Sequence, residues 1–192
     1  MIIVGITGSI GCGKTYLGNI LKSMGYSVYN PDHWTHDLYS KPAFLKLIEK
    51  EFPQTFENGY FNKRTLRNLV FNNNDELKKL EKIVHPFLNK RLKQTIRQFA
   101  TDGDIIFLDV ALLLEFGWDK FCDYVVVADV DDQTQKQRVM KRDGISAEDF
   151  EKIVAVQMPK NKKKEYADFV INTAMPENIL KVQLIKFIKE IL

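Results

Sequence analysis

Short, continuously apolar runs recur along this chain and limit the folds that it can adopt. Four of them span residues 2–6, 105–108, 124–128 and 169–171, and residues 26–29 form a plausible fifth. Runs without polar alternation are typical of parallel strands that are covered on both faces. Because helical patterns separate the runs, they predict a three-layer α/β fold with a central parallel sheet and right-handed crossovers.

Charge and cysteine content narrow the class of protein. The 192 residues carry a net charge of +3, which suits anionic substrates but is too weak for a dedicated nucleic-acid binder. Cys12 and Cys122 lie far apart in no metal-binding pattern, and Cys12 is interpreted as a small filler rather than a reactive thiol. No run approaches the ~20 apolar residues of a membrane helix. We therefore expect a cytoplasmic protein with neither a nucleic-acid nor a membrane partner.

The order of the runs predicts three parts in the chain. Residues 1–32, 101–131 and 167–192 hold the apolar runs and form the predicted core. Residues 33–100 carry helical patterns and no strong strand signal, and they are too long for one connection, so we expect a helical insertion. Residues 132–166, named here the lid segment, predict a cationic helical hairpin between two core strands.

Two amphipathic stretches make up the first part of the lid segment. They span residues 133–142 and 147–158 and are separated at Gly144. Ser146, followed by Asp149, is a capping-box-like start for the second stretch. The pattern therefore predicts two helices with a break between them.

A glycine-rich segment follows the first apolar run. It fits the pattern G-x-x-x-x-G-K-[ST] and reads Gly8-Ser9-Ile10-Gly11-Cys12-Gly13-Lys14-Thr15, with Tyr16 next. Glycines let backbone N–H groups face phosphate oxygens, and the following helix adds the positive end of its dipole. Lys14 supplies charge to the β- and γ-phosphates, and the Thr15 hydroxyl can ligate Mg²⁺. Because a strand pattern precedes the segment and an amphipathic helix pattern follows it, triphosphate binding is favoured over a chance glycine turn.

Acidic residues follow two of the apolar runs. Asp32 comes just after the run at 26–29, and ligands of parallel sheets gather where strands end. Asp32 can therefore take the proton of an acceptor hydroxyl, hold a water on Mg²⁺, or cap the next helix. Asp109 closes the run at 105–108, so a role near the magnesium ion and a structural hydrogen bond both stay open, as they do for Glu115.

Cationic side chains are concentrated in the lid segment. Arg138 and Arg142 are four residues apart and share one face of a helix, with Gln135 one turn earlier. Planar guanidinium groups suit the charge of a transferring phosphoryl group, although a solvated helix face is the alternative. The lysines further along predict a solvated rim: Lys160, Lys162, Lys163 and Lys164.

Together these motifs resemble the dephospho-CoA kinase family over nearly the whole chain. Beyond the phosphate loop, the matching segments are Asn30-Pro31-Asp32, Arg64-Thr65-Leu66-Arg67-Asn68-Leu69-Val70-Phe71, His85-Pro86, Ala111-Leu112-Leu113-Leu114-Glu115, the set Gln135, Arg138, Arg142 and Asp143, then Gln157 and Ala167-Asp168-Phe169-Val170-Ile171-Asn172. The loop alone is not specific, but the ordered set at compatible spacing is.

The resemblance implies a P-loop kinase fold and ATP-dependent phosphorylation of the ribose 3′-hydroxyl of dephospho-CoA, with Mg²⁺ as cofactor. Asp32 would be the base, and Lys14, Arg138 and Arg142 would stabilise the transferring phosphoryl group. The implied acceptor contacts are Asp32, Arg64, His85, Leu113 and Glu115. For His85, a buried hydrogen-bonding role is the favoured alternative. We expect a monomer or a weak homo-oligomer.

The chain departs from the family's pattern at three positions. Asn30 replaces the first Asp of an Asp-Ala-Asp segment and removes one carboxylate near the metal, and Pro31 stiffens the turn. Ala111 replaces a proline, a change expected to affect acceptor fit more than chemistry.

Two alternative functions are also compatible with a phosphate loop. Another P-loop kinase would share the fold and act on a nucleotide or a small alcohol. A GTPase would need an Asn-Lys-x-Asp motif, but Asn161-Lys162-Lys163 is followed by Lys164. The motifs therefore favour a kinase over a GTPase.

Overall fold

The computed structural model describes residues 1–71, 73–99 and 104–192, apart from the side chains of Asp32 and His33. The chain forms two compact units. The first consists of Met1–Pro31 with Thr101–Leu192, and the second of Asp32–Ala100. Across the described residues, every helix is too short or too polar to span a lipid bilayer.

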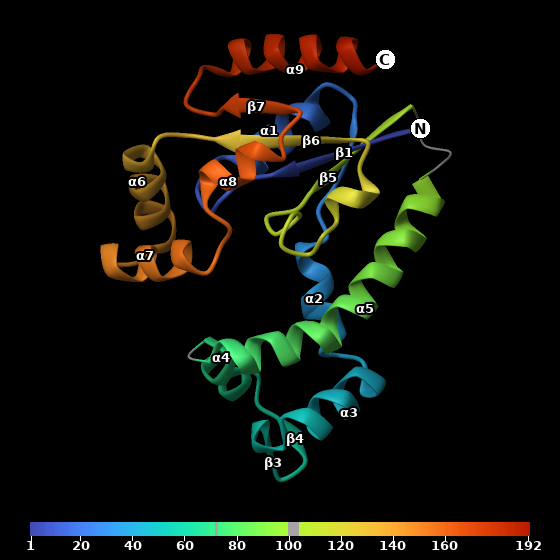
Figure 1. Ribbon diagram of the computed structural model, residues 1–192, viewed down its shortest axis with the longest axis vertical. Coiled ribbons are helices and arrows are strands. Elements are labelled where there is room, and N and C mark those ends of the chain that lie inside the picture. The colour runs from blue at the N-terminus through green and yellow to red at the C-terminus, as the bar shows by residue number, and fades with distance from the viewer. Residues whose placement is uncertain (72, 100–103) are drawn as a thin grey trace. The chain divides into compact units, whose positions relative to one another are not determined.

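A five-stranded parallel sheet forms the centre of the first unit (Figure 1). Its strands are β1 (Ile2–Thr7), β2 (Ser27–Tyr29), β5 (Ile105–Asp109), β6 (Tyr124–Asp129) and β7 (Phe169–Asn172), and their order is β2-β5-β1-β6-β7. All four pairings are parallel. The parallel sheet predicted from the continuous apolar runs is therefore confirmed, the short run at 26–29 included.

Two helices cover one face of this sheet. They are α1 (Lys14–Ser23) and α9 (Glu177–Ile191), which contact each other, and Figure 1 shows α9 running along β7. Leu17 and Leu184 are buried there with Val4 in one apolar core. Gly5 points to the opposite face, where Leu113 packs so closely that a Cβ on the glycine would lie 2.6 Å from it. The connection between β5 and β6, including a 3-10 turn at Asp119–Phe121, covers part of that second face.

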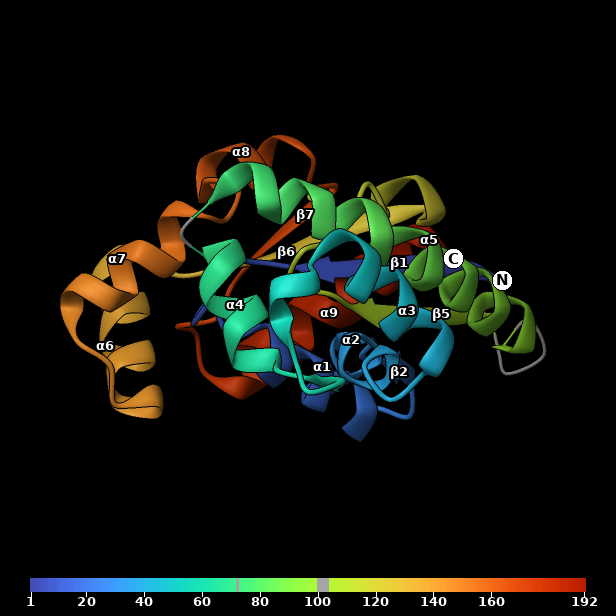
Figure 2. The same cartoon turned by 90° about the horizontal axis from the view of Figure 1, so that it is seen from below.

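The lid segment holds three helices, α6 (Asp132–Asp143), α7 (Ala147–Ala155) and α8 (Lys160–Glu165). Figure 1 shows α6 beyond the end of β6, and Figure 2 shows α6 and α7 side by side. Local signals set their bounds. Gly144 ends α6 with a positive φ of 65°, and the Ser146 side chain accepts from the Asp149 N–H at the start of α7. The predicted break and the predicted cap are confirmed.

The second unit is mainly helical. Its helices are α2 (Asp32–Leu38), α3 (Pro42–Glu51), α4 (Lys63–Phe71) and α5 (Asn74–Phe99), with a 3-10 turn at Pro53–Thr55, and α5 contacts the other three helices (Figure 1). Its apolar side chains gather around Phe44, whose ring meets Tyr39 and Phe87 edge-on. A hairpin of β3 (Phe56–Glu57) and β4 (Tyr60–Phe61) is also present, which the sequence analysis missed.

Candidate active site

The phosphate loop, residues 8–15, connects β1 to α1. Its backbone has a φ of 76° at Gly11 and 82° at Gly13, a region that favours glycine. A Cβ on Gly13 would lie 2.6 Å from Thr173 Oγ1, and one on Gly11 would lie 2.5 Å from Val139 Cγ2. Close packing against α6 and the segment after β7 therefore requires glycine at both positions.

The backbone N–H groups of the loop fall into two sets. Ile10 donates to Gln157 Oε1 at 3.0 Å, and Cys12 donates to the Ser9 carbonyl at 3.1 Å. Among the described residues, no protein acceptor is matched to the N–H groups of Gly11, Gly13, Lys14 and Thr15. Because unpaired donors at a helix N-terminus bind anions, these groups are available to phosphate oxygens.

A buried carboxylate holds the loop lysine. Lys14 Nζ is paired with Asp109 Oδ1, and Asn30 Nδ2 donates to Asp109 Oδ2 at 3.3 Å. Asp109 is 3% exposed at the end of β5, between β1 and β2 in the sheet. Asn30 therefore donates a hydrogen bond to Asp109, where an aspartate would add a second negative charge.

Three further residues are predicted to act on the donor side: Asp32, Thr15 and Tyr16. The Asp32 backbone begins α2, but its side chain lies outside the described part of the chain. Thr15 is exposed. Tyr16 is 40% exposed, and its hydroxyl lies 3.4 Å from Glu177 Oε2. The roles predicted for these residues stay predictions.

The two lid arginines have different surroundings. Arg138 donates to Thr173 Oγ1 at 2.9 Å and to the Thr173 carbonyl at 3.1 Å, and the same hydroxyl donates to the Cys12 carbonyl. Arg142 is 61% exposed and makes two hydrogen bonds of 2.7 Å to Asp143, which lower the pKa of that carboxyl. Arg138 is thus linked to the phosphate loop, whereas among the described residues Arg142 is held by Asp143 alone.

The residues predicted on the acceptor side are spread over both units. In the second unit, Arg64 is exposed near the start of α4, and His85 is half-buried in α5. In the first unit, Leu113 is 0% exposed, so its side chain offers no surface to a substrate in this conformation. Glu115 accepts from the Met158 N–H at 3.0 Å and is bound to a buried lysine.

That lysine is Lys163, and the prediction that it belongs to a solvated rim is wrong. It is 0% exposed, and its Nζ lies 2.9 Å from both Glu115 Oε1 and the Ala111 carbonyl. Lys160 donates to the Val130 carbonyl at 2.7 Å, and Lys164 pairs with Asp129 at 2.6 Å. Through these hydrogen bonds and ion pairs, the three lysines bind α8 to the end of β6 and to the segments that follow β5 and β6.

Both cysteines are free. Burial raises the pKa of the Cys12 thiol, and it raises the pKa of the Cys122 thiol to about 12. A thiol held in its neutral form is a poor nucleophile. The interpretation of Cys12 as a filler residue therefore fits its surroundings.

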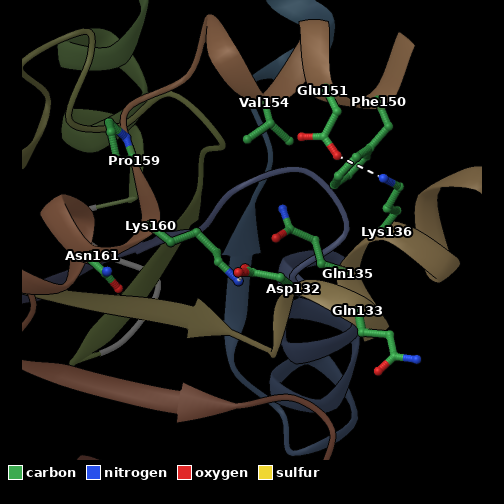
Figure 3. Close-up of a pocket in the computed structure, with 10 residues that line it drawn as sticks. All are labelled: Asp132, Gln133, Gln135, Lys136, Phe150, Glu151, Val154, Pro159, Lys160 and Asn161. Atoms are coloured by element: carbon green, nitrogen blue, oxygen red, sulfur yellow. Dashed lines mark hydrogen bonds and ion pairs between the residues drawn. The ribbon is translucent and has the colours of Figure 1, made fainter. Parts of the chain in front are cut away.

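Two glutamines of the site were not predicted as site residues from the sequence. Gln135 Nε2 donates to the Ile10 carbonyl at 2.7 Å, and Gln157 accepts from the Ile10 N–H. Both glutamines lie in the segments that carry the family resemblance, and that was the signal that pointed to them. Gln135 also lines a pocket of about 650 Å³ between α6, α7 and α8 (Figure 3).

Comparison with known proteins gives a consistent result along the chain. A family model described as dephospho-CoA kinase matches residues 2–177. A dephospho-CoA kinase of Bartonella quintana is 36% identical over 100% of this chain and 99% of its own length. One from Brucella melitensis is 38% identical over 98% of this chain and 94% of its own length.

Solved structures share the fold. A Thermus thermophilus protein designated TT1252 has a TM-score of 0.87 and 28% identity, covering 100% of this chain and 97% of its own. A shikimate kinase of Acinetobacter baumannii has a TM-score of 0.55 and 14% identity, covering 99% of this chain and 94% of its own. The predicted P-loop kinase fold is confirmed.

Proposed function

Because this chain belongs to the dephospho-CoA kinase family, we propose that its phosphate loop and the groups around it transfer the γ-phosphoryl group of ATP to the ribose 3′-hydroxyl of dephospho-CoA. The products are CoA and ADP, and the reaction is the final step of CoA biosynthesis. One observation carries the proposal for the site: the unmatched N–H groups of the loop lie beside Lys14 and Asp109 in a chain that matches the family over its length.

The donor side follows from these groups. The N–H groups of Gly11, Gly13, Lys14 and Thr15 bind the β-phosphate, and the Lys14 ammonium exchanges Asp109 for the β- and γ-phosphate oxygens. Lys14 then offsets the charge that develops on the bridging oxygen as its bond to the γ-phosphorus breaks.

The oxygen donors near the loop fit Mg²⁺. Within the described ranges no three His, Cys, Asp or Glu side chains gather as an all-protein metal cage. Mg²⁺ instead prefers one or two protein oxygens together with phosphates and waters, and Thr15 Oγ1 and the Asp109 carboxylate are donors of that kind. When bound, the ion would offset charge on the β- and γ-phosphates.

Asp32 is the proposed general base. Its carboxylate accepts the proton of the 3′-hydroxyl while that oxygen attacks the γ-phosphorus, and ADP leaves. The position of Asp32 directly after β2 supports this role, because ligands of parallel sheets gather where strands end.

The lid arginines complete the proposed transition-state contacts. Arg142, which within the described part of the chain is bound to Asp143 alone, can exchange that carboxylate for phosphoryl oxygens. Arg138 stabilises the donor side near the loop, to which Thr173 links it. Residues 132–166 then act as a lid, and residues 1–32, 101–131 and 167–192 act as the nucleotide-binding core.

The acceptor side is assigned to residues 33–100, with contacts from Arg64 and His85, and to Glu115 in the core. This assignment rests on the family's motifs. We also propose a cytoplasmic location, since the free cysteines suit a reducing compartment, and a monomer or a weak homo-oligomer.

The test of the acceptor compares ATP consumption with dephospho-CoA and with a panel of nucleoside monophosphates. We expect turnover with dephospho-CoA, and the position of the new phosphate on the product can be read by ³¹P NMR. Turnover with monophosphates but not with dephospho-CoA would contradict the proposal.

The test of the base is Asp32→Asn, which we expect to lower kcat by roughly 100- to 10,000-fold with little change in ATP affinity. Asp75→Asn is the matched control, because Asp75 is an 85% exposed carboxylate near the start of α5. A loss of kcat below about tenfold in Asp32→Asn would exclude Asp32 as the base.

A further inference from the structure

The two backbone polar groups of Ile10 are held by side chains distant in sequence. The carbonyl of the Ile10–Gly11 peptide unit accepts from Gln135 Nε2 at 2.7 Å, and the N–H of the Ser9–Ile10 peptide unit donates to Gln157 Oε1 at 3.0 Å. Gln135 is 2% exposed in α6, and Gln157 lies two residues after the end of α7. One residue of the phosphate loop thus contacts both α6 and the segment that follows α7.

Two other contacts join α6 to the same loop. Gly11 packs against Val139, where a Cβ would lie 2.5 Å from Cγ2. Arg138 donates to Thr173 Oγ1, which donates to the Cys12 carbonyl at 2.8 Å. The helix therefore contacts two successive loop residues directly and is linked to the next one through Thr173.

The side chain of Gln135 is shown in Figure 3. Gln135 and Gln133 both line the pocket, and the side chain of Gln133 extends in a different direction from that of Gln135. Gln133 is exposed, and among the described residues it makes no hydrogen bond to the loop. The two glutamines thus offer a matched pair on one helix.

From these contacts we propose that Gln135 and Gln157 are positioning residues for phosphoryl transfer. Together they hold the two peptide units on either side of the Ile10 Cα, an arrangement called here the clasp, and keep the loop in its phosphate-binding conformation. The inference rests on the proposed function, since it assigns the loop to the phosphates of ATP.

The physical reason lies in the freedom of a glycine-rich loop. Gly8 and Gly11 flank the segment and allow many backbone conformations, so the peptide units on either side of Ile10 can rotate. Rotation of the Ile10–Gly11 unit would replace the Gly11 N–H, which is proposed to face the phosphates, with the Ile10 carbonyl oxygen, which carries charge of the same sign as phosphate. The clasp opposes this rotation, because Gln135 holds the carbonyl of the Ile10–Gly11 unit and Gln157 holds the N–H of the preceding unit.

The clasp also couples the lid segment to the loop. Phosphate that binds the loop favours the loop conformation in which Ile10 engages both glutamines. The same conformation keeps α6 and α7 against the loop, and α6 carries Arg142. Nucleotide binding and the position of Arg142 are therefore coupled, so that each favours the other.

The experiment uses the full chain with four single substitutions. Gln135→Met removes the donor and Gln157→Met removes the acceptor, both at similar side-chain volume. Gln157→Glu keeps an acceptor oxygen, and Gln133→Met is the control on the same helix. Three quantities are measured: hydrogen–deuterium exchange of the peptide that contains Ile10 in nucleotide-free protein, Kd for ADP with Mg²⁺, and kcat with KM for ATP.

We expect Gln135→Met and Gln157→Met each to raise Kd for ADP by about tenfold, the size of one buried hydrogen bond, and to speed exchange at Ile10. Gln157→Glu should keep the slow exchange of the wild type, and Gln133→Met should match the wild type throughout. The double variant Gln135→Met/Gln157→Met should lose less affinity than the product of the single losses, because both side chains hold adjacent peptide units of one residue.

Two results would overturn the clasp. One is a Kd for ADP within about twofold of the wild type in both methionine variants, which is less than one hydrogen bond is worth. The other is equal exchange at Ile10 in Gln157→Met and Gln157→Glu, since a merely structural glutamine would not distinguish them. ADP binding and exchange need no acceptor, so a wild-type protein that failed to phosphorylate dephospho-CoA would refute the proposed function and leave the clasp to be judged on these two readouts.

Discussion

Replacing Lys163 with methionine tests how much a buried ion pair made by α8 of the lid segment contributes to stability. The Lys163 side chain is 0% exposed, and its ammonium group contacts both oxygens of Glu115 and the Ala111 carbonyl. Methionine keeps most of the volume and removes these contacts. The Ala111 carbonyl retains the Thr7 hydroxyl at 3.0 Å, and Glu115 retains the Met158 N–H.

The magnitude follows from what the substitution leaves behind. Removing one partner of a buried pair costs about 3–5 kcal/mol. Glu115 is 20% exposed and keeps a donor, so the cost of Lys163→Met lies at the lower end, about 3 kcal/mol. Glu115→Gln leaves an ammonium with no exposed surface and should cost more, about 4 kcal/mol.

Urea unfolding followed by circular dichroism measures both losses, with Lys162→Met, at an exposed neighbour, as the control. We expect the control to change the free energy of unfolding by about 0.5 kcal/mol or less. In a thermal scan, Lys163→Met should lower Tm by about 6–12 °C. A loss below about 1 kcal/mol, or a smaller loss for Glu115→Gln than for Lys163→Met, would refute the reasoning.

Three further predictions concern the loop, the lid and a buried thiol. Arg142→Lys should lower kcat at least about tenfold, because a point charge does not replace a planar fork, and steady-state kinetics near wild type would make the lid assignment wrong. Gly13→Ala should lower the free energy of unfolding, measured in urea, by more than Gly25→Ala does. Both glycines have a positive φ, 82° and 91° respectively, but only at Gly13 would an added Cβ meet Thr173. Equal losses in the two variants would show that the contact with Thr173 costs nothing. Cys122 has a folded pKa of about 12 against 9.0, so its contribution to stability is present below pH 9 and is lost as pH rises towards 12. Native protein at pH 8 should therefore resist alkylation at Cys122, and labelling as fast as in urea would contradict the burial.

Most of the sheet was predictable because its strands are covered on both faces. A run such as residues 124–128 has no polar position, so its pattern excludes an exposed strand. The break at Gly144 and the cap at Ser146 were predictable for a similar reason, since each depends on neighbours within a few residues. The hairpin of β3 and β4 was missed, although Asn58-Gly59 is a strong turn signal, because its strands are too short to show alternation.

The rest of the candidate site depends on contacts between distant residues. Lys163 lies in a charged stretch that indicates solvent, and its burial follows from Glu115, 48 positions earlier. The contact of Gln135 with Ile10 spans 125 positions, and a glutamine on a helix has no local feature that identifies such a partner. The pairing of Lys14 with Asp109 is of the same kind, because two adjacent parallel strands bring them together.

Without nucleotide, the phosphate-binding lysine already has an anion, and that anion belongs to the same chain. An incoming phosphate must displace Asp109 from Lys14. The affinity for nucleotide therefore depends on the difference in free energy between the Lys14–phosphate contact and the Lys14–Asp109 contact. The exchange leaves a carboxylate that is 3% exposed without its cation, which is unfavourable for a nucleotide that arrives alone. A nucleotide that carries a divalent ion restores the balance of charge at once. Under the proposed function, the internal carboxylate would therefore favour the metal-complexed form of the donor before any phosphoryl group moves.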